Sequence, residues 1–126
     1  MNKNKIIVRG DNKLEDISKY FQHEYPYLKL EFFSKTHENH EGNVMADRLD
    51  GDMVVSECGG TAGDIEIHDE MKVSELEEEV KNKLSLNVQV FRKSGKIWLE
   101  TTTTDDWTLR FQNDRAEEAF KFNESI

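Results

Sequence analysis

The sequence predicts an α+β domain with helices on one face of a largely antiparallel sheet and a short C-terminal helix. Three observations lead to this prediction: a strand–helix–strand pattern that occurs twice, alternating apolar residues in the strands, and turn residues that join the later strands. We expect two pseudo-repeated halves of the order β-α-β-β or β-α-β-β-β. The 126 residues suffice for one hydrophobic core, so we expect a single domain over 1–126 with a tail at 113–126.

The first strand–helix–strand unit lies at the start of the chain. Residues 5–9 form its first predicted strand, and residues 13–25 form its helix, which ends because Pro26 disfavours a helical residue before it. The buried stripe of this helix, spaced by three and four residues, consists of Leu14, Ile17, Phe21 and Tyr25. Residues 28–34 alternate in polarity and form the next strand.

A second unit with the same pattern follows after a shift of about 59 residues. Its predicted elements are a strand at 64–68, a helix at 73–84 and a strand at 86–92. The matching helical stripe consists of Val73, Leu76, Val80 and Leu84. Because three elements match in order with one gap, we expect an internal duplication of about residues 5–58 and 64–112. The alternative is that any two strand–helix–strand stretches look alike.

A hairpin follows the second strand of the second unit. A four-residue turn contains Gly95, which readily takes a positive φ, and pairs Arg92 with Ile97. The returning strand covers residues 97–102, where the β-branched threonines favour extended backbone.

Four further segments complete the expected order. An acidic turn at 105–106 precedes a predicted strand at 107–112, and residues 52–57 form a late strand of the first unit. The first unit also carries an insertion loop at 34–52. A glycine-rich linker at 58–63 joins the two units.

The sheet face away from the helices is predicted to carry large apolar side chains. The aliphatic alternation of Leu86, Val88 and Val90 must meet the helices, so the intervening residues point to the opposite face. A two- or four-residue turn before residue 107 places alternate residues of the last strand there, whereas a three-residue turn would reverse them. The predicted binding face consists of Phe33, Phe91, Trp98, Trp107, Leu109 and Phe111. Such a patch usually marks a binding surface; the alternative is that the C-terminal helix or the curl of the sheet covers it.

Glu100 is an acidic residue expected on this face, between Trp98 and Thr102. Burial there would raise the pKa of its carboxyl group and make it a candidate acid or base. The alternative is an edge-strand carboxylate paired with Arg110 or Lys96.

The charge of the chain restricts the classes of partner. Asp and Glu number 26 against 17 Lys and Arg, which gives a net charge of −9. Because this surface repels phosphate backbones, we expect no nucleic-acid partner, although Arg92, Lys93 and Lys96 form a local basic cluster. No apolar run is long enough to span a bilayer, and the chain has one cysteine, so we expect a cytoplasmic protein with no membrane partner.

Two segments carry side chains of chemically reactive types. His37 and His40 lie in the polar insertion loop, where we expect them to be solvated, so we predict no metal site and no cofactor. Cys58 precedes the glycine-rich linker, but its neighbours Glu57 and Asp64 have the wrong charge to stabilise a thiolate. We therefore name no catalytic residue.

A segment near the C-terminus resembles a known group of proteins. The stretches VQVFRKSG at 88–95, WLETT at 98–102 and TDDWTL at 104–109 are similar to a group of small uncharacterised bacterial proteins. The resemblance implies a bacterial, cytoplasmic protein and no particular activity.

The paired β-α-β-β-β order also resembles the vicinal oxygen chelate fold. Members of that fold bind a metal through His and Glu residues on a curled sheet. By this resemblance Glu57 and His68 match two ligand positions, while Arg9 and Gln112 stand at the other two. A likeness at the level of the fold does not by itself define a function.

The aromatic face leads to the functional prediction. We expect a small acidic binding protein that uses this face for a protein partner or to form a homodimer. The alternative is a small-molecule-binding protein or enzyme with its site in the curled sheet around Trp98 and Glu100.

Overall fold

The computed structural model describes residues 3–34 and 47–124. Within these residues the elements, in chain order, are β1 (Lys3–Val8), α1 (Leu14–Glu24), β2 (Leu28–Phe33), η2 (Val55–Cys58), β3 (Gly63–His68), α2 (Val73–Leu84), β4 (Asn87–Ser94), β5 (Ile97–Glu100), η3 (Thr102–Thr104) and α3 (Leu109–Glu124), where η denotes a 3-10 helix. The predicted α+β class with a C-terminal helix is confirmed.

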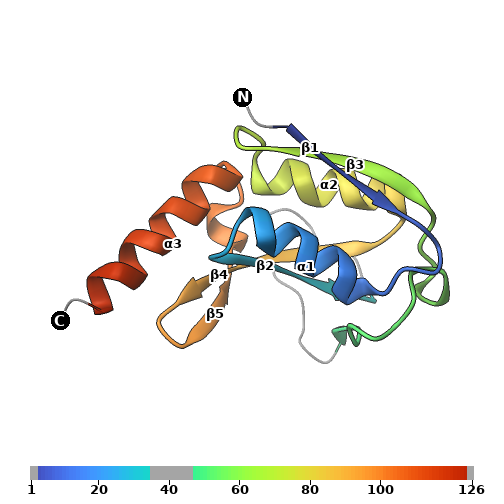
Figure 1. Ribbon diagram of the computed structural model, residues 1–126, viewed down its shortest axis with the longest axis horizontal. Coiled ribbons are helices and arrows are strands. Elements are labelled where there is room, and N and C mark those ends of the chain that lie inside the picture. The colour runs from blue at the N-terminus through green and yellow to red at the C-terminus, as the bar shows by residue number, and fades with distance from the viewer. Residues whose placement is uncertain (1–2, 35–46, 125–126) are drawn as a thin grey trace.

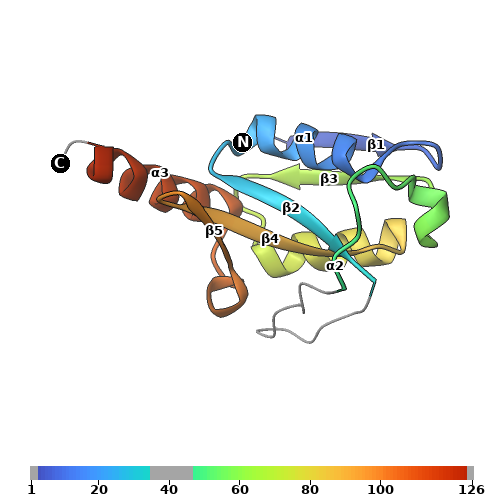
Figure 2. The same cartoon turned by 90° about the horizontal axis from the view of Figure 1, so that it is seen from below.

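The strands form two antiparallel sheets rather than one. β1 pairs with β3, and β4 pairs with β2 on one side and β5 on the other. In Figure 1, α1 and α2 lie between the β1–β3 ribbon above and the β2–β4–β5 sheet below. Figure 2 shows the two helices on opposite sides of the molecule, while α3 extends away with the C-terminus at its far end.

One hydrophobic core fills the space that these elements enclose. The predicted stripes of both helices are buried, which confirms the helical spacing: Leu14, Ile17, Phe21 and Tyr25 on the first stripe, and Val73, Leu76, Val80 and Leu84 on the second. The strands complete the core with Ile6, Val8, Ile65 and Ile67 from the ribbon, and Leu28, Leu30, Phe32, Val88 and Val90 from the larger sheet. The predicted aliphatic face therefore meets the helices.

Residues that the predicted duplication matches with each other also pair across both sheets. Ile6 pairs with Ile65 between β1 and β3, and Glu31 pairs with Gln89 between β2 and β4. A local twofold axis relating two copies would produce this register in both sheets. The duplication itself stays a prediction.

Two predicted strands are wrong, because their residues form straps across the helix N-termini. Residues 51–54 form the first strap, where a strand at 52–57 was expected, and residues 105–108 form the second, where a strand at 107–112 was expected. Each strap makes a single bridge: Val54 with Lys13, and Thr108 with Lys72. After that one bridge the chain turns into η2 or α3.

The straps accept hydrogen bonds from the first turns of α1 and α2. A helix has no partners of its own for these N–H groups. The bonds run from Leu14 to Met53 and from Glu15 to Gly51 in the first unit, and from Val73 to Trp107 and from Ser74 to Asp105 in the second. Because the pattern repeats, Val55 and Leu109, the residues after the two straps, occupy equivalent positions and are both fully buried.

The β4–β5 hairpin is tighter than predicted. Ser94 pairs with Ile97, so the turn has two residues, Gly95 and Lys96, rather than four. The φ of Gly95 is 61°, as the first position of a type II′ turn requires. β5 ends at Glu100, two residues earlier than expected.

We expect Gly95→Ala to destabilise the protein by about 1 kcal/mol, because a Cβ atom is unfavourable at a positive φ. Apart from Gly95 and its two chain neighbours, no residue has an atom within 4 Å of the position of that Cβ, so the cost comes from the backbone alone. Urea unfolding measures the effect, with Lys96→Ala as the neighbouring control. Equal stability of Gly95→Ala and the parent protein would contradict the turn.

Candidate functional site

Four of the seven predicted binding residues lie on the sheet face away from α1 and α2: Phe33, Phe91, Trp98 and Glu100. Phe33 and Phe91 are on this face and outside the helix-side core, yet only 1% and 5% of their surfaces are exposed. Trp98 lies on the same face and is partly exposed. The predicted face is therefore largely sealed, and Trp98 is the one of these three rings that solvent reaches.

The other three aromatic or aliphatic members of the predicted face lie elsewhere. Trp107 belongs to the second strap, Leu109 is buried in the helix-side core, and Phe111 is on α3. The rings of Trp107 and Phe111 meet edge-on with centroids 4.9 Å apart. Alternate residues share a face in a strand but not in a helix. The incorrect prediction of a strand at 107–112 is therefore the reason why these three residues were assigned to the face.

Two lysines flank Trp98. The Nζ atoms of Lys29 and Lys93 lie 4.9 and 5.0 Å from the ring centroid, within the range of cation–π attraction. Trp98 pairs with Lys93 in the sheet, whereas the sequence predicted pairing with Phe91. This register differs from the predicted one by two residues, so Trp98 still points to its predicted face. The sequence analysis did not predict a role for Lys29. Alternation along β2 places Lys29 on the same face as Phe33, and this spacing was a usable signal.

β5 carries Trp98 at the edge of the sheet. The described residues include no strand on the outer side of β5, so one row of its backbone groups is unpaired. On the opposite face from Trp98, Ile97 is 59% exposed and Leu99 is 37% exposed. This short edge is thus apolar on both faces.

Glu100 lies opposite Phe91 at the end of β5 and is partly exposed. It makes no ion pair with Lys96 or Arg110 in the described part of the chain. Arg110 instead binds Asp69, with Nη2 3.1 Å from Oδ1.

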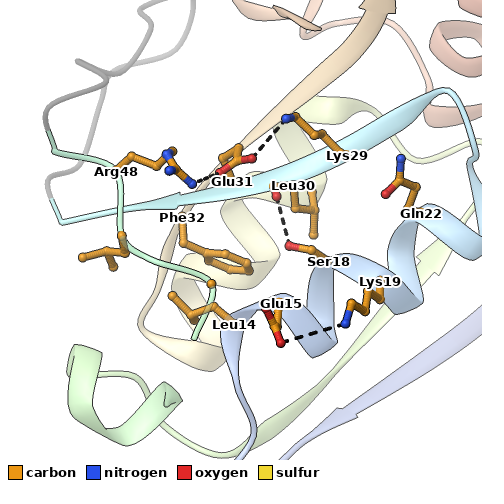
Figure 3. A pocket seen from close by; sticks show the side chains of 12 residues that line it. Leu14, Glu15, Ser18, Lys19, Gln22, Lys29, Leu30, Glu31, Phe32 and Arg48 are labelled. Atoms are coloured by element: carbon orange, nitrogen blue, oxygen red, sulfur yellow. Dashed lines mark hydrogen bonds and ion pairs between the residues drawn. The ribbon is translucent and has the colours of Figure 1, made fainter. Parts of the chain in front are cut away.

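A separate pocket of about 330 Å³ lies between α1 and β2 (Figure 3). Its apolar side chains come from Leu14, Leu30, Phe32 and Leu49, and none of the predicted binding residues lines it. The Ser18 hydroxyl at its wall donates to the Leu30 carbonyl at 3.0 Å, so this hydroxyl already has a partner.

The charged side chains of this pocket pair with each other. Glu31 binds Lys29 at 3.2 Å and Arg48 at 3.0 Å, and Glu15 lies 3.9 Å from Lys19. Figure 3 shows these pairs on the two sides of the pocket. Because each of the three cations already pairs with one of the two carboxylates, the pocket holds no unpaired charge with which to select an ion.

The reactive residue types do not converge in the described residues. Within residues 3–34 and 47–124, no three His, Cys, Asp or Glu side chains are placed to hold a metal ion. His37 and His40 fall outside the described residues. Burial raises the pKa of the Cys58 thiol, and the negative charge of Glu57 adds to this, so the thiol is not activated as a nucleophile.

The chain matches no protein-family model, and comparisons with curated proteins and with solved structures give no match. The two resemblances seen in the sequence therefore stay predictions. Among the helices that the structure describes, none has the length and apolar composition needed to cross a membrane.

Proposed function

We propose that this is a small binding protein that holds an extended acidic segment of a protein partner against β5. The observation that carries the proposal is Trp98, a partly exposed indole ring on an edge strand with two ammonium groups within 5.0 Å of its centroid. Tryptophan is among the residues that contribute most to binding energy at protein interfaces. Its place here is not explained by core packing, since it lies outside the helix-side core.

The free edge of β5 supports an extended partner. A peptide that adds to a sheet edge gains backbone hydrogen bonds, and its alternate side chains meet the two faces of the sheet. One row of such side chains would meet Trp98, and the other would meet Ile97 and Leu99, which are exposed on the opposite face.

The lysines support an acidic partner. Lys93 has no ion-pair partner among the described residues, whereas Lys29 is already bound to Glu31. The net charge of −9 opposes an acidic partner at long range. Salt screens that repulsion over about 8 Å at physiological ionic strength, so contacts with Lys93 decide the local preference.

The test is selection of peptides from a random library by the whole protein, followed by fluorescence anisotropy of an enriched peptide. We expect enrichment of Asp and Glu among alternating apolar residues. Trp98→Ala should weaken binding of that peptide at least about tenfold, because the ring forms the centre of the contact. Tyr20→Ala, which removes an exposed ring from α1, is the matched control.

Two outcomes would overturn the proposal. The first is a peptide affinity that Trp98→Ala changes no more than Tyr20→Ala does. The second is a concentration-dependent dimer in sedimentation equilibrium that Trp98→Ala dissociates, which would assign the edge to a second copy of the chain.

A further inference from the structure

A second feature, which shares only Lys93 with the proposed peptide site at β5, is a groove of about 220 Å³ between the end of β4 and α3. Both views show α3 leaving the body beside the β4–β5 hairpin (Figures 1 and 2). The groove is lined by Arg92, Lys93, Ser94, Trp107, Arg115, Ala116 and Ala119. Three of these side chains are cationic and none is acidic, in a chain where acidic residues outnumber basic ones by 26 to 17.

The cations of this groove are poorly neutralised. Most described lysines and arginines have an ion-pair partner, whereas Arg92 and Lys93, like Lys72, Lys81 and Lys96, have none among the described residues. Arg115 lies 3.4 Å from Glu118, one turn along α3, and both side chains are largely exposed. An exposed pair of this kind contributes little, so Arg115 can exchange Glu118 for another anion at small cost.

The remaining walls restrict where an anion can lie. The guanidinium carbon of Arg92 lies 5.8 Å from the centre of the Trp107 ring, which holds this cation against one wall. Ala116 is buried and Ala119 carries only a methyl group, so the α3 side leaves space in front of the cations. The Ser94 hydroxyl adds a neutral hydrogen-bonding group.

We propose that this groove binds a phosphate monoester group, with Arg92 and Arg115 as its principal ligands. Guanidinium groups bind phosphate oxygens through paired N–H donors. Lys93 is not counted as a ligand, because alternation along β4 points its side chain to the Trp98 face, opposite Arg92. The volume is below the range of about 300–1,000 Å³ typical for drug-sized ligands, which favours one anionic group with a small attached moiety.

The test is an NMR titration of the whole protein with inorganic phosphate and with phosphoserine, at constant ionic strength. We expect saturable shifts of the amides of Ser94, Trp107 and Ala116. Arg92→Gln and Arg115→Gln should each weaken binding about tenfold, since each removes a charged hydrogen-bonding ligand. Lys81→Gln, which removes an exposed lysine on α2, is the control of equal charge change and should alter binding less than twofold.

The pH dependence adds an independent readout. Phosphoserine becomes a dianion above its second pKa of about 6, so its affinity for a cationic groove should rise from about pH 5.5 to about pH 7.5. Tighter binding of phosphoserine than of phosphate identifies an organic monoester as the ligand, and equal binding identifies the free ion. The proposal fails if the groove amides show no saturable shift, or if Lys81→Gln weakens binding as much as Arg92→Gln. Arg115 is exposed, so its variant tests the site even if Arg92→Gln unfolds.

Discussion

Replacing Leu109 by alanine is expected to destabilise the protein by about 3 kcal/mol, the largest effect we predict. Leu109 is fully buried at the first residue of α3 and belongs to the same core as α1 and α2. Its backbone N–H also donates to the Met71 carbonyl at 2.8 Å, so the position of the residue is held by the backbone. The neighbours therefore cannot move in to fill the cavity. Urea unfolding, with midpoint and slope, measures the loss.

Phe111→Ala provides the control for this prediction. Phe111 lies two residues further along α3, is 47% exposed, and contacts the edge of Trp107. Its truncation should cost less than about 1 kcal/mol, because much of the ring is already in water. If residues 107–112 were a strand, Leu109 and Phe111 would share a face and lose similar stability. Equal losses would therefore contradict the start of α3 at Leu109.

Strands β1 to β4 and both central helices could be predicted in outline because local patterns determine them. The stripe spaced by three and four residues gave α2 the bounds 73–84, which the structure reproduces. The strand alternation of β2 and β4 placed the aliphatic residues toward the helices correctly. The division into two sheets could not be predicted, since partner choice depends on contacts far apart in sequence.

The two straps show that alternation of apolar and polar residues is not enough to predict a strand. Residues 52–57 and 107–112 both read as short strands, and both have a single bridge in the structure, at Val54 and Thr108. Their first residues instead form turns that supply backbone acceptors to the N–H groups at a helix N-terminus, and the rest belongs to η2 or α3. Since the same error occurs at equivalent places in the two units, a repeat comparison extended to these segments is the signal that was missed.

The parts of the candidate sites that depend on local sequence patterns could be predicted, and the parts that depend on contacts between distant segments could not. The exposed Trp98 could be placed on its face because a register shift of two residues preserves the face. The burial of Phe33 and Phe91 was not predictable from β2 and β4, because it depends on what covers them. The phosphate groove joins Arg92 to Arg115 across two elements, so no sequence spacing reveals it.

Asp69→Ala is expected to destabilise the protein by about 2 kcal/mol near neutral pH. Oδ1 of Asp69 accepts a hydrogen bond from the Tyr25 hydroxyl at 2.8 Å and another from Arg110 at 3.1 Å. The three residues join the end of α1, the turn after β3 and the second residue of α3. Burial raises the pKa of the Tyr25 phenol, and the Asp69 charge adds to this, so Tyr25 remains a donor across the stable pH range. Removing Asp69 leaves a buried hydroxyl and a guanidinium without their shared acceptor.

The same contact gives this variant a characteristic pH dependence. Burial alone would raise the pKa of Asp69, but the hydrogen bonds from Tyr25 and Arg110 outweigh it and hold the pKa below its ordinary value of 3.8. A carboxyl group whose pKa is lower in the folded state stabilises the protein above its unfolded pKa, and that contribution is lost as the pH falls through the folded pKa. The stability difference between the parent protein and Asp69→Ala should therefore be constant near neutrality and shrink below about pH 4.

Urea unfolding of both proteins over this pH range measures the difference, with Asp11→Ala as the control. Asp11 is exposed and lies 3.9 Å from Arg9, so its loss should leave the pH dependence of the parent protein unchanged. If the difference in unfolding free energy between the parent protein and Asp69→Ala stayed the same down to low pH, the Asp69 charge would not be what holds α3 to the rest of the domain. The anchoring would then come from core residues such as Leu109, and the two variants together separate these contributions.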